Sequence, residues 1–277
     1  MKIFRFLSFF VIVLCITLAA FKCYSPKNYL DPEGPRFSAN YSDFRVQSKD
    51  TLKIVSFNIK YSRKIERAIR ELDSLPEIKD ADILLLQEMN EYGSDQVARA
   101  LGYNYIYYPA TLHPQTESNF GNAVLTPWPI QADQKILLPY EPSLGRTKRI
   151  AVSAQISIGE RKIMAYSVHT ATIILSPDMR LKQADSLLNS LSVDEEHIII
   201  GGDFNTIFEQ NIRDLDAVFT KNNFTRATRR VGPTLQRGPF KFRTDHLYVK
   251  GFEVLDAGTV FTEASDHQPI WTILVAK

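Results

Sequence analysis

The sequence predicts an α/β protein of the α+β type, in which two mixed β-sheets pack together and helices flank them. Segments with the character of strands outnumber segments with helical spacing. Many consecutive strands are also joined directly by loops, whereas neighbouring parallel strands need a long crossover connection. A purely parallel sheet is therefore excluded, and two packed sheets with outer helices fit the count of elements.

The individual elements follow from local patterns between Thr51 and the C-terminus. Apolar residues at helical spacing, caps and first-turn prolines indicate helices, and short apolar runs bounded by turn residues indicate strands. Helices are expected over 65–75, from a cap at Ser94 to Gly102, after Ser176-Pro177 and after Asn205. Strands are expected over 52–59, 82–86, 103–109, 122–126, 148–158, 162–168, 197–200, 242–249, 252–260 and 269–275.

Three segments divide the chain: residues 1–21, 22–50 and 51–277. In the first, Lys2 and Arg5 precede an apolar run that ends near small residues, the order of a signal peptide or an N-terminal membrane anchor. Cys23 adds the alternative of a lipid attachment site, although the residues before it are bulky. The second segment reads as a linker or arm, and the third as one domain. The domain is therefore expected outside the cytoplasm: periplasmic, secreted or anchored to a membrane.

Composition and charge exclude some classes of protein. The 277 residues are 44% apolar and 23% charged, as in globular proteins, with a formal net charge of +2. Without Lys2 and Arg5 the 33 basic residues become 31, equal to the 31 acidic ones. A dedicated DNA-binding protein usually shows a strong basic excess. Both cysteines, Cys15 and Cys23, precede the domain, so a metal in the domain needs oxygen or nitrogen ligands.

Polar side chains recur where the predicted apolar strands end or begin. Such groups at the edge of a core cost free energy of desolvation unless they are paired or hold an ion. Carboxylate and amide oxygens without thiolates favour Mg²⁺, with Mn²⁺ or Ca²⁺ as alternatives and zinc as a weaker one. The residues in question are Asn58, Glu88, His169, Asp203, Asn205, Asp245, His246, Asp266 and His267.

Two of these motifs carry a resemblance to a known family. Gly201-Gly202-Asp203-Phe204-Asn205 and Ser265-Asp266-His267 resemble the signature pair of the endonuclease/exonuclease/phosphatase superfamily, over about residues 51–277. The supporting motifs stand in the family's order: Ser56-Phe57-Asn58, Gln87-Glu88, Gly121-Asn122-Ala123-Val124-Leu125-Thr126, Val168-His169 and Thr244-Asp245-His246. One departure is Thr170, where many relatives have leucine. The resemblance implies a DNase-I-like four-layer sandwich and a divalent-metal-dependent phosphodiester hydrolase.

The resemblance also implies roles around the metal and the water. Glu88 would be the main metal ligand, helped by Asn58 and Asp266. Asp203 would orient or deprotonate the attacking water, and Asn205 would position that water. The cofactor implied is Mg²⁺.

Further roles concern the phosphate. His267, held by Asp245, would contact the scissile phosphate, and His169 would stabilise its developing charge, both histidines being cationic. Arg149 would clamp a phosphate oxygen, and Asn122 would support the phosphate or His169. His246 is expected to be structural.

Two classes of function remain open at this point. One is a hydrolase acting on nucleic acid, a phospholipid head group or a phosphoinositide; the other is a catalytically silent binding module on the same fold. Because every expected position is filled, the enzyme is favoured. Exposed tyrosines over 103–108 would suit stacking or a membrane, but their alternation indicates a strand with one buried face. No stretch indicates a lipid-insertion hairpin. No obligate protein partner is expected, and the N-terminus would supply any membrane association.

Overall fold

The computed structural model describes residues 26–43, 48–114, 116–142 and 145–277. The expected signal or anchor segment, residues 1–21, lies outside this part of the chain. Among the helices of the described part, none has the length and apolar character needed to cross a membrane.

One sheet contains eight strands in the order β1-β5-β6-β4-β3-β16-β15, with β2 also paired to β5. Within it β3 and β4 run parallel, so their carboxyl ends lie at the same edge, while the other pairs are antiparallel. The strands are β1 (Lys27–Asn28), β2 (Phe37–Ala39), β3 (Thr51–Asn58), β4 (Ile83–Met89), β5 (Asn104–His113), β6 (Ser118–Thr126), β15 (Phe252–Thr259) and β16 (Ile270–Ala276).

The second sheet contains six strands in the order β11-β14-β10-β9-β8-β7, and a separate hairpin joins β12 to β13. Here β9 and β10 are the parallel pair, and β14 runs antiparallel to β10. The strands are β7 (Ile130–Leu137), β8 (Ile150–Ile158), β9 (Arg161–His169), β10 (His197–Asp203), β11 (Thr225–Arg226), β12 (Leu235–Arg237), β13 (Phe240–Phe242) and β14 (Asp245–Lys250).

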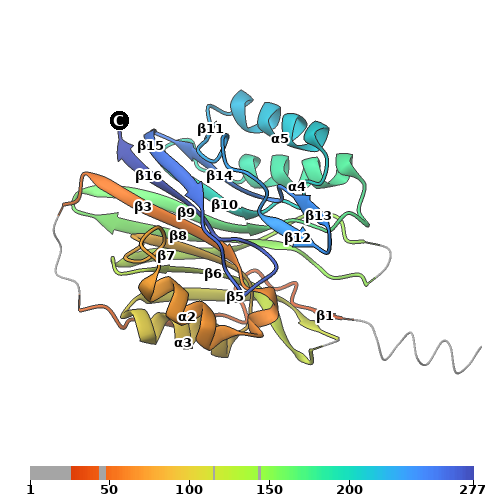
Figure 1. Ribbon diagram of the computed structural model, residues 1–277, viewed down its shortest axis with the longest axis horizontal. Helices are drawn as coiled ribbons and strands as arrows, with labels where there is room; N and C mark the ends of the chain where they lie inside the picture. Colours follow the sequence, from red (N-terminus) through yellow and green to blue (C-terminus); the bar gives the residue numbers. More distant parts are fainter. Residues whose placement is uncertain (1–25, 44–47, 115, 143–144) are drawn as a thin grey trace, which may run out of the picture.

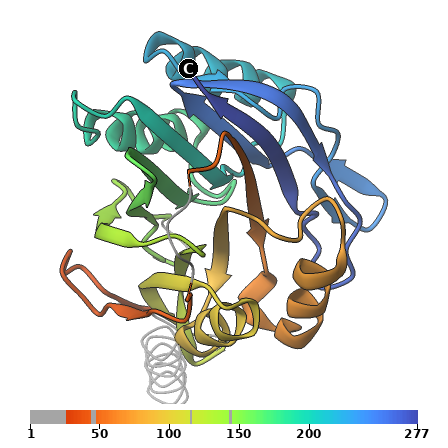
Figure 2. The ribbon, with the colours of Figure 1, turned by 90° about the vertical axis from the view of Figure 1, so that its left-hand side faces the viewer.

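Helices cover the outer faces of the two sheets, so the protein has four layers (Figure 1, Figure 2). The helices α2 (Ile65–Ser74) and α3 (Glu91–Leu101) lie on one side, and α4 (Pro177–Asn189) and α5 (Glu209–Lys221) on the other. A short 3-10 turn, η1 (Lys60–Ser62), follows β3. The predicted fold class is therefore confirmed: two packed mixed sheets flanked by few helices.

Three apolar clusters hold the layers together. The first lies between the sheets and includes Ile54, Leu85 and Val152. The second packs the eight-stranded sheet against α2 and α3, and the third packs the other sheet against α4 and α5. Burying apolar area between every pair of layers is the main stabilising contribution, at about 25 cal/mol per Å².

The segment before the domain lies along the eight-stranded sheet. Its strands β1 and β2 both pair with β5, and Arg36 forms a two-bonded ion pair with Asp133 at 2.9 and 2.7 Å. The fully buried Lys135 donates to the backbone carbonyls of Tyr29, at 3.2 Å, and Gly34. The described part of the predicted linker is thus an ordered edge of the sheet.

Local differences from the sequence expectations have simple causes. The helix expected to begin at Ser94 starts earlier, because Asn90 accepts a hydrogen bond from the Gly93 N–H at 2.7 Å and so caps α3. Strand β7 was not expected, since its exposed and partly exposed residues lack an apolar run. Its partner β8 supplies the edge on which it pairs.

Candidate functional site

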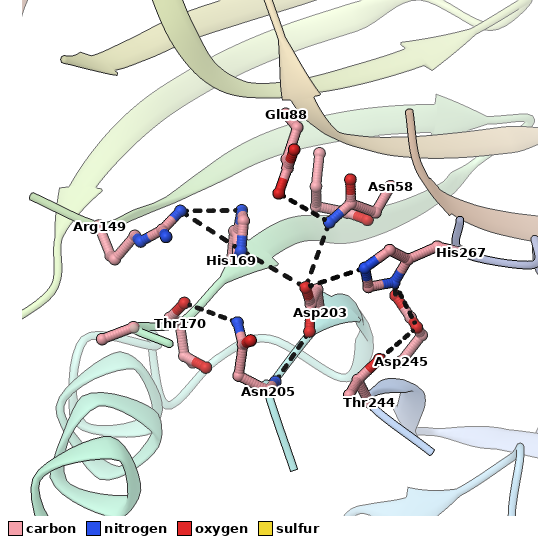
Figure 3. A network of polar contacts seen from close by, with 12 residues as sticks. Asn58, Glu88, Arg149, His169, Thr170, Asp203, Asn205, Thr244, Asp245 and His267 are labelled. Carbon is pink, nitrogen blue, oxygen red and sulfur yellow. Dashed lines mark hydrogen bonds and ion pairs between the residues drawn. The ribbon is translucent and has the colours of Figure 1, made fainter. Parts of the chain in front are cut away.

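Strand ends from both sheets meet at one edge of the sandwich. Asn58 ends β3, and Glu88 stands one residue before the end of β4. In the other sheet, the register places Asp203 between its partners His169 on β9 and Asp245 on β14. Because the sheets pack face to face, these five side chains from distant segments face one another (Figure 3).

A backbone irregularity aims Glu88 into this space. The residue has a φ of 58°, in the left-handed region that side chains rarely adopt, and the pairing of β4 with β6 shifts register between Leu86 and Met89. A regular strand would direct consecutive side chains to opposite faces. The bulge therefore turns the Glu88 carboxylate towards the second sheet, at a position that regular pairing would not provide.

The amide of Asn58 joins the carboxylates of the two sheets. Its Nδ2 donates to Glu88 Oε1 at 3.3 Å and to Asp203 Oδ2 at 3.2 Å, while the Lys60 N–H donates to its Oδ1 at 3.1 Å. Asn58 is fully buried. The backbone donor holds the amide in one orientation, so Asn58 sets the spacing between the two acids.

Asp203 is a buried carboxyl group that is partly protonated and partly ionised near neutral pH. Its Oδ1 accepts from the Asn205 N–H at 2.8 Å, and its Oδ2 lies 3.4 Å from His169 Nε2 and 3.8 Å from His267 Nε2. Burial raises the pKa of Asp203 to about 7, against the lowering effect of the His267 charge. A carboxyl group with such a pKa accepts a proton more readily than an ordinary aspartate, as a general base requires.

His267 and Asp245 form a buried carboxylate–imidazole pair. His267 Nδ1 donates to Asp245 Oδ2 at 2.9 Å, and the hydroxyls of Thr234 and Thr244 donate to the same oxygen at 2.6 and 2.8 Å. Burial alone would lower the pKa of His267, but the charges of Asp245 and Asp203 raise it to about 10. Burial acts against the ionised Asp245, yet the His267 charge and these hydrogen bonds keep its pKa below the ordinary value. His267 is therefore a cation at neutral pH.

His169 differs from the cationic histidine that was expected. Arg149 lies against its ring, with Arg149 Nη1 3.1 Å from Nδ1 and 3.3 Å from Nε2. Burial, the Arg149 charge and the His267 charge place the pKa of His169 well below its ordinary value. The imidazole is therefore neutral, and the fixed positive charges beside it come from Arg149 and His267. Arg149 also stacks over the Phe120 ring at 5.2 Å, which orients the guanidinium.

The structure reassigns Asn122 and qualifies Asp266. Both hydrogens of Asn122 Nδ2 have backbone acceptors, Ile150 O at 3.0 Å and Ser167 O at 3.1 Å. The amide nitrogen is thus committed to joining the two sheets and not to a phosphate, whereas the other expected role of Asn122, support of His169, stays a prediction. Asp266 is partly exposed at the edge of the site, and its Oδ2 pairs with Lys60 Nζ at 2.9 Å, so this lysine would compete with a metal for the carboxylate.

Two further expected residues are placed clearly. Asn205, with a φ of 51°, donates from Nδ2 to Thr170 O at 3.1 Å. The side-chain oxygen Oδ1 of Asn205 is therefore the group available to a water. His246 is fully buried on the side of β14 away from the site and contacts the Thr206 hydroxyl at 2.8 Å. Burial lowers the pKa of His246 to about 3, in agreement with its structural assignment.

The sequence assigned no role to several residues at the site. Thr234 and Thr244, the latter named only as part of a motif, hold Asp245, and Lys60 holds Asp266. All three residues of η1 have positive φ, at 35°, 59° and 53° for Lys60, Tyr61 and Ser62. Left-handed non-glycine residues are costly and gather at functional sites. Its place in the Thr244-Asp245-His246 motif was the one signal available for Thr244, whereas Thr234 precedes the β12–β13 hairpin, eleven residues before Asp245.

The donor set fits a divalent cation at Glu88 better than at His267. Asp203, Asp245 and His267 offer ligand atoms within 4.8 Å of one another. The proton of His267 occupies that group at neutral pH, because the pKa of its imidazole is about 10. Glu88 is different: it forms no ion pair with a described residue, and burial raises its pKa against the lowering effects of the His267 and Arg149 charges and of the Asn58 hydrogen bond. A buried carboxylate without a direct ion pair is the oxygen donor that hard cations prefer.

Comparisons with known proteins agree with this arrangement. A family model described as "Endonuclease/Exonuclease/phosphatase family" matches residues 55–267. An UPF0294 protein from Yersinia pseudotuberculosis is 27% identical over 130 residues, which cover 47% of this chain and about half of that protein (49%).

Solved structures share the fold at low sequence identity. An endonuclease/exonuclease/phosphatase family protein from Leptotrichia buccalis has a TM-score of 0.67 at 20% identity, covering 80% of this chain and 98% of its own. A mannosyl-6-phosphatase from Bacteroides thetaiotaomicron has a TM-score of 0.63 at 17% identity. The match covers 81% of this chain and 99% of the phosphatase chain. Because the family model spans most of the chain and the fold agrees, the chain belongs to the endonuclease/exonuclease/phosphatase family and has its hydrolase fold.

Proposed function

We propose that this protein is an exported, divalent-metal-dependent phosphodiester hydrolase that uses a water activated by Asp203. The observation that carries the proposal is the position of Asp203, a buried carboxylate with a pKa of about 7 between the acid Glu88 and the cation His267. A phosphodiester is anionic, so its hydrolysis needs a base for the water and positive charge around the phosphate.

The residues supply these needs in defined places. Asp203 accepts the proton of the attacking water through Oδ2, the oxygen that Asn58 Nδ2 contacts and that lies near His169 and His267, while the Asn205 N–H holds Oδ1. The Asn205 side-chain carbonyl orients that water. The new bond joins the water oxygen to phosphorus, the bond to the leaving oxygen breaks, and solvent protonates the leaving group. Mg²⁺, with Mn²⁺ or Ca²⁺ as alternatives, would be held by Glu88 with Asp266, and by Asn58 once its amide turns to present Oδ1 in place of Nδ2; the ion would neutralise phosphate charge.

The cationic side chains act on the phosphate oxygens. His267 Nε2 points towards the same space as Asp203 Oδ2, while its Nδ1–H is fixed by Asp245. The imidazolium therefore donates to a phosphate oxygen from Nε2. Arg149, held between Phe120 and His169, provides the second positive charge. Neutral His169 orients Arg149 and lies near Asp203, so its contribution is a hydrogen bond rather than a charge.

The test is hydrolysis of bis(p-nitrophenyl) phosphate with Mg²⁺ by the purified full-length chain. Asp203→Ala removes the base, and we expect a loss of at least about 10²-fold in turnover. Asp256→Ala is the matched control, because this exposed aspartate on β15 is outside the site. Full activity of Asp203→Ala would refute the proposed mechanism, and a parent that binds the diester without turnover would indicate a silent binding module. Comparison with p-nitrophenyl phosphate separates diesterase from phosphatase activity.

A further inference from the structure

Exposed apolar side chains gather around the candidate site. The described part of the chain has nine exposed leucine, isoleucine, valine, methionine and phenylalanine side chains. Six of these nine belong to segments at the site edge, and the three most exposed of them are Phe261 at 73%, Phe208 at 70% and Phe240 at 65%. We call these six the site rim: Ile173, Ile174, Met179, Phe208, Phe240 and Phe261.

The connections of the rim segments place them beside the reacting groups. The loop with Ile173 and Ile174 follows β9, which ends at His169, and Phe208 precedes α5 in the segment after β10, which ends at Asp203. Phe261 lies in the loop that leads to Asp266 and β16. All these connections are at the end of the sandwich where the site lies.

The β12–β13 hairpin is attached directly to the site. Leu235 forms an isolated bridge with His267, and the Gln236 N–H donates to Asp266 O at 3.1 Å. The hairpin is a two-stranded sheet separate from the two large sheets (Figure 1). Near its tip, Phe240 stacks on Phe242 at 6.4 Å and still exposes most of its side chain. This hairpin was not expected from the sequence.

The hairpin region is also strongly basic. Residues 229–243 contain five arginines and lysines and no acidic residue. Arg237 and Lys241 are exposed and form no ion pair within the part of the chain that the structure describes. Free cations beside exposed apolar side chains are the combination that binds the surface of an anionic bilayer, where apolar groups enter the acyl boundary and cations meet the head groups.

We propose that the site rim docks onto an anionic phospholipid bilayer and presents the site to a head-group phosphodiester. This inference rests on the proposed hydrolase function and specifies its substrate class. The aliphatic side chains Ile173, Ile174 and Met179 favour a bilayer over a nucleic acid, because bases stack on aromatic rings and not on aliphatic chains.

Site-specific tryptophans test the docking in the full-length chain, independently of any membrane affinity of the N-terminus. Phe240→Trp is the reporter, and Val193→Trp is the matched control, because Val193 is 95% exposed in the loop before β10, at the opposite end. The natural Trp128 and Trp271 contribute equally to both. Vesicles of phosphatidylcholine with one-quarter phosphatidylglycerol, carrying brominated acyl chains, quench a tryptophan only when it enters the acyl boundary.

We expect the Phe240→Trp emission to shift to shorter wavelength and to be quenched, with no change for Val193→Trp. Adding Arg237→Ser and Lys241→Ser to the reporter should weaken its apparent vesicle affinity at least about tenfold, as two lost contacts to anionic lipid predict. No quenching of Phe240→Trp, or equal quenching of both reporters, would overturn the proposal. A shift of the Phe240→Trp emission by single-stranded DNA but not by vesicles would also overturn the proposal and would assign the site rim to nucleic acid.

Failure of docking and failure of the enzyme are distinguished by the soluble substrate. Phe240→Ser should keep hydrolysis of bis(p-nitrophenyl) phosphate within about twofold of the parent, because Phe240 contacts none of the proposed catalytic residues. A parent without diesterase activity but with a quenched reporter would refute the hydrolase and retain the docking surface. A parent with full diesterase activity whose Phe240→Trp reporter is not quenched would support the hydrolase and refute the docking surface.

Discussion

Replacement of Asp245 by asparagine tests how the fold keeps His267 charged. The substitution preserves shape but removes the negative charge that Nδ1 of His267 contacts at 2.9 Å. Asp245 is the largest of the influences that raise the pKa of His267 from 6.5 to about 10. After this substitution, we expect the buried imidazole to lose most of its charge at neutral pH, because burial is then opposed only by the smaller effects of Asp203 and Glu88.

The expected loss of stability follows from this pKa. One pKa unit corresponds to 1.36 kcal/mol, so a value of about 10 against 6.5 contributes about 4 kcal/mol to the free energy of unfolding at pH 7. The pKa is raised in the folded state, so the contribution is complete below pH 6.5 and disappears as the pH rises through about 10. A loss of about 3–5 kcal/mol is also typical when one partner of a buried ion pair is removed.

The assay is urea denaturation followed by circular dichroism at pH 7 and pH 10.5, in EDTA so that no bound cation contributes. We expect Asp245→Asn to be less stable than the parent by about 4 kcal/mol at pH 7 and by much less at pH 10.5. Asp256→Asn is the control, since this exposed aspartate has no ion pair with a described residue. A difference in the free energy of unfolding between the parent and Asp245→Asn below about 1 kcal/mol at pH 7, or an equal difference at both pH values, would refute the reasoning.

Four other results are expected. Glu88→Gln should raise the Mg²⁺ concentration for half-maximal activity at least about tenfold, and an unchanged value would move the metal elsewhere. Gly202→Ala should cost more than about 3 kcal/mol in a denaturation experiment, because Gly202 has a φ of 153° and an added Cβ would lie 1.8 Å from the Val168 carbonyl oxygen. Asn122→Ala should cost about 1–3 kcal/mol by removing two buried hydrogen bonds between the sheets, yet change kcat/KM of the folded enzyme less than about threefold. The rate should rise with pH up to about 7 as Asp203 ionises, and a rate that instead increased towards pH 5 would argue against Asp203 as the base.

The sequence was most informative where each residue's position along a strand decided its place. Asn58, Glu88, His169, Asp203 and Asp245 all lie within or at the end of short apolar runs. Strand ends meet at sheet edges, so their convergence could be expected from the order of motifs. The fold class followed in the same way, because direct strand connections limit the topologies that two sheets can take.

The charge states of the site could not be read from the sequence. His169 and His267 are both histidines after or before a strand, yet one is neutral beside Arg149 and the other is cationic beside Asp245. Their difference depends on which charge lies within a few ångströms after folding. The Asn122 amide is similar: its sequence motif is compatible with a ligand, and only the packing of two sheets shows that backbone carbonyls use both of its hydrogens.

By itself, the sequence determined the elements, the sandwich class and the set of polar residues at one edge, because these depend on local periodicity and on the order of short motifs. Only the tertiary structure decided the protonation of the histidines, the left-handed backbone at Glu88 and the apolar, basic rim around the site. These features arise from contacts between residues far apart in the chain, and electrostatic energies depend on distance and burial rather than on residue type.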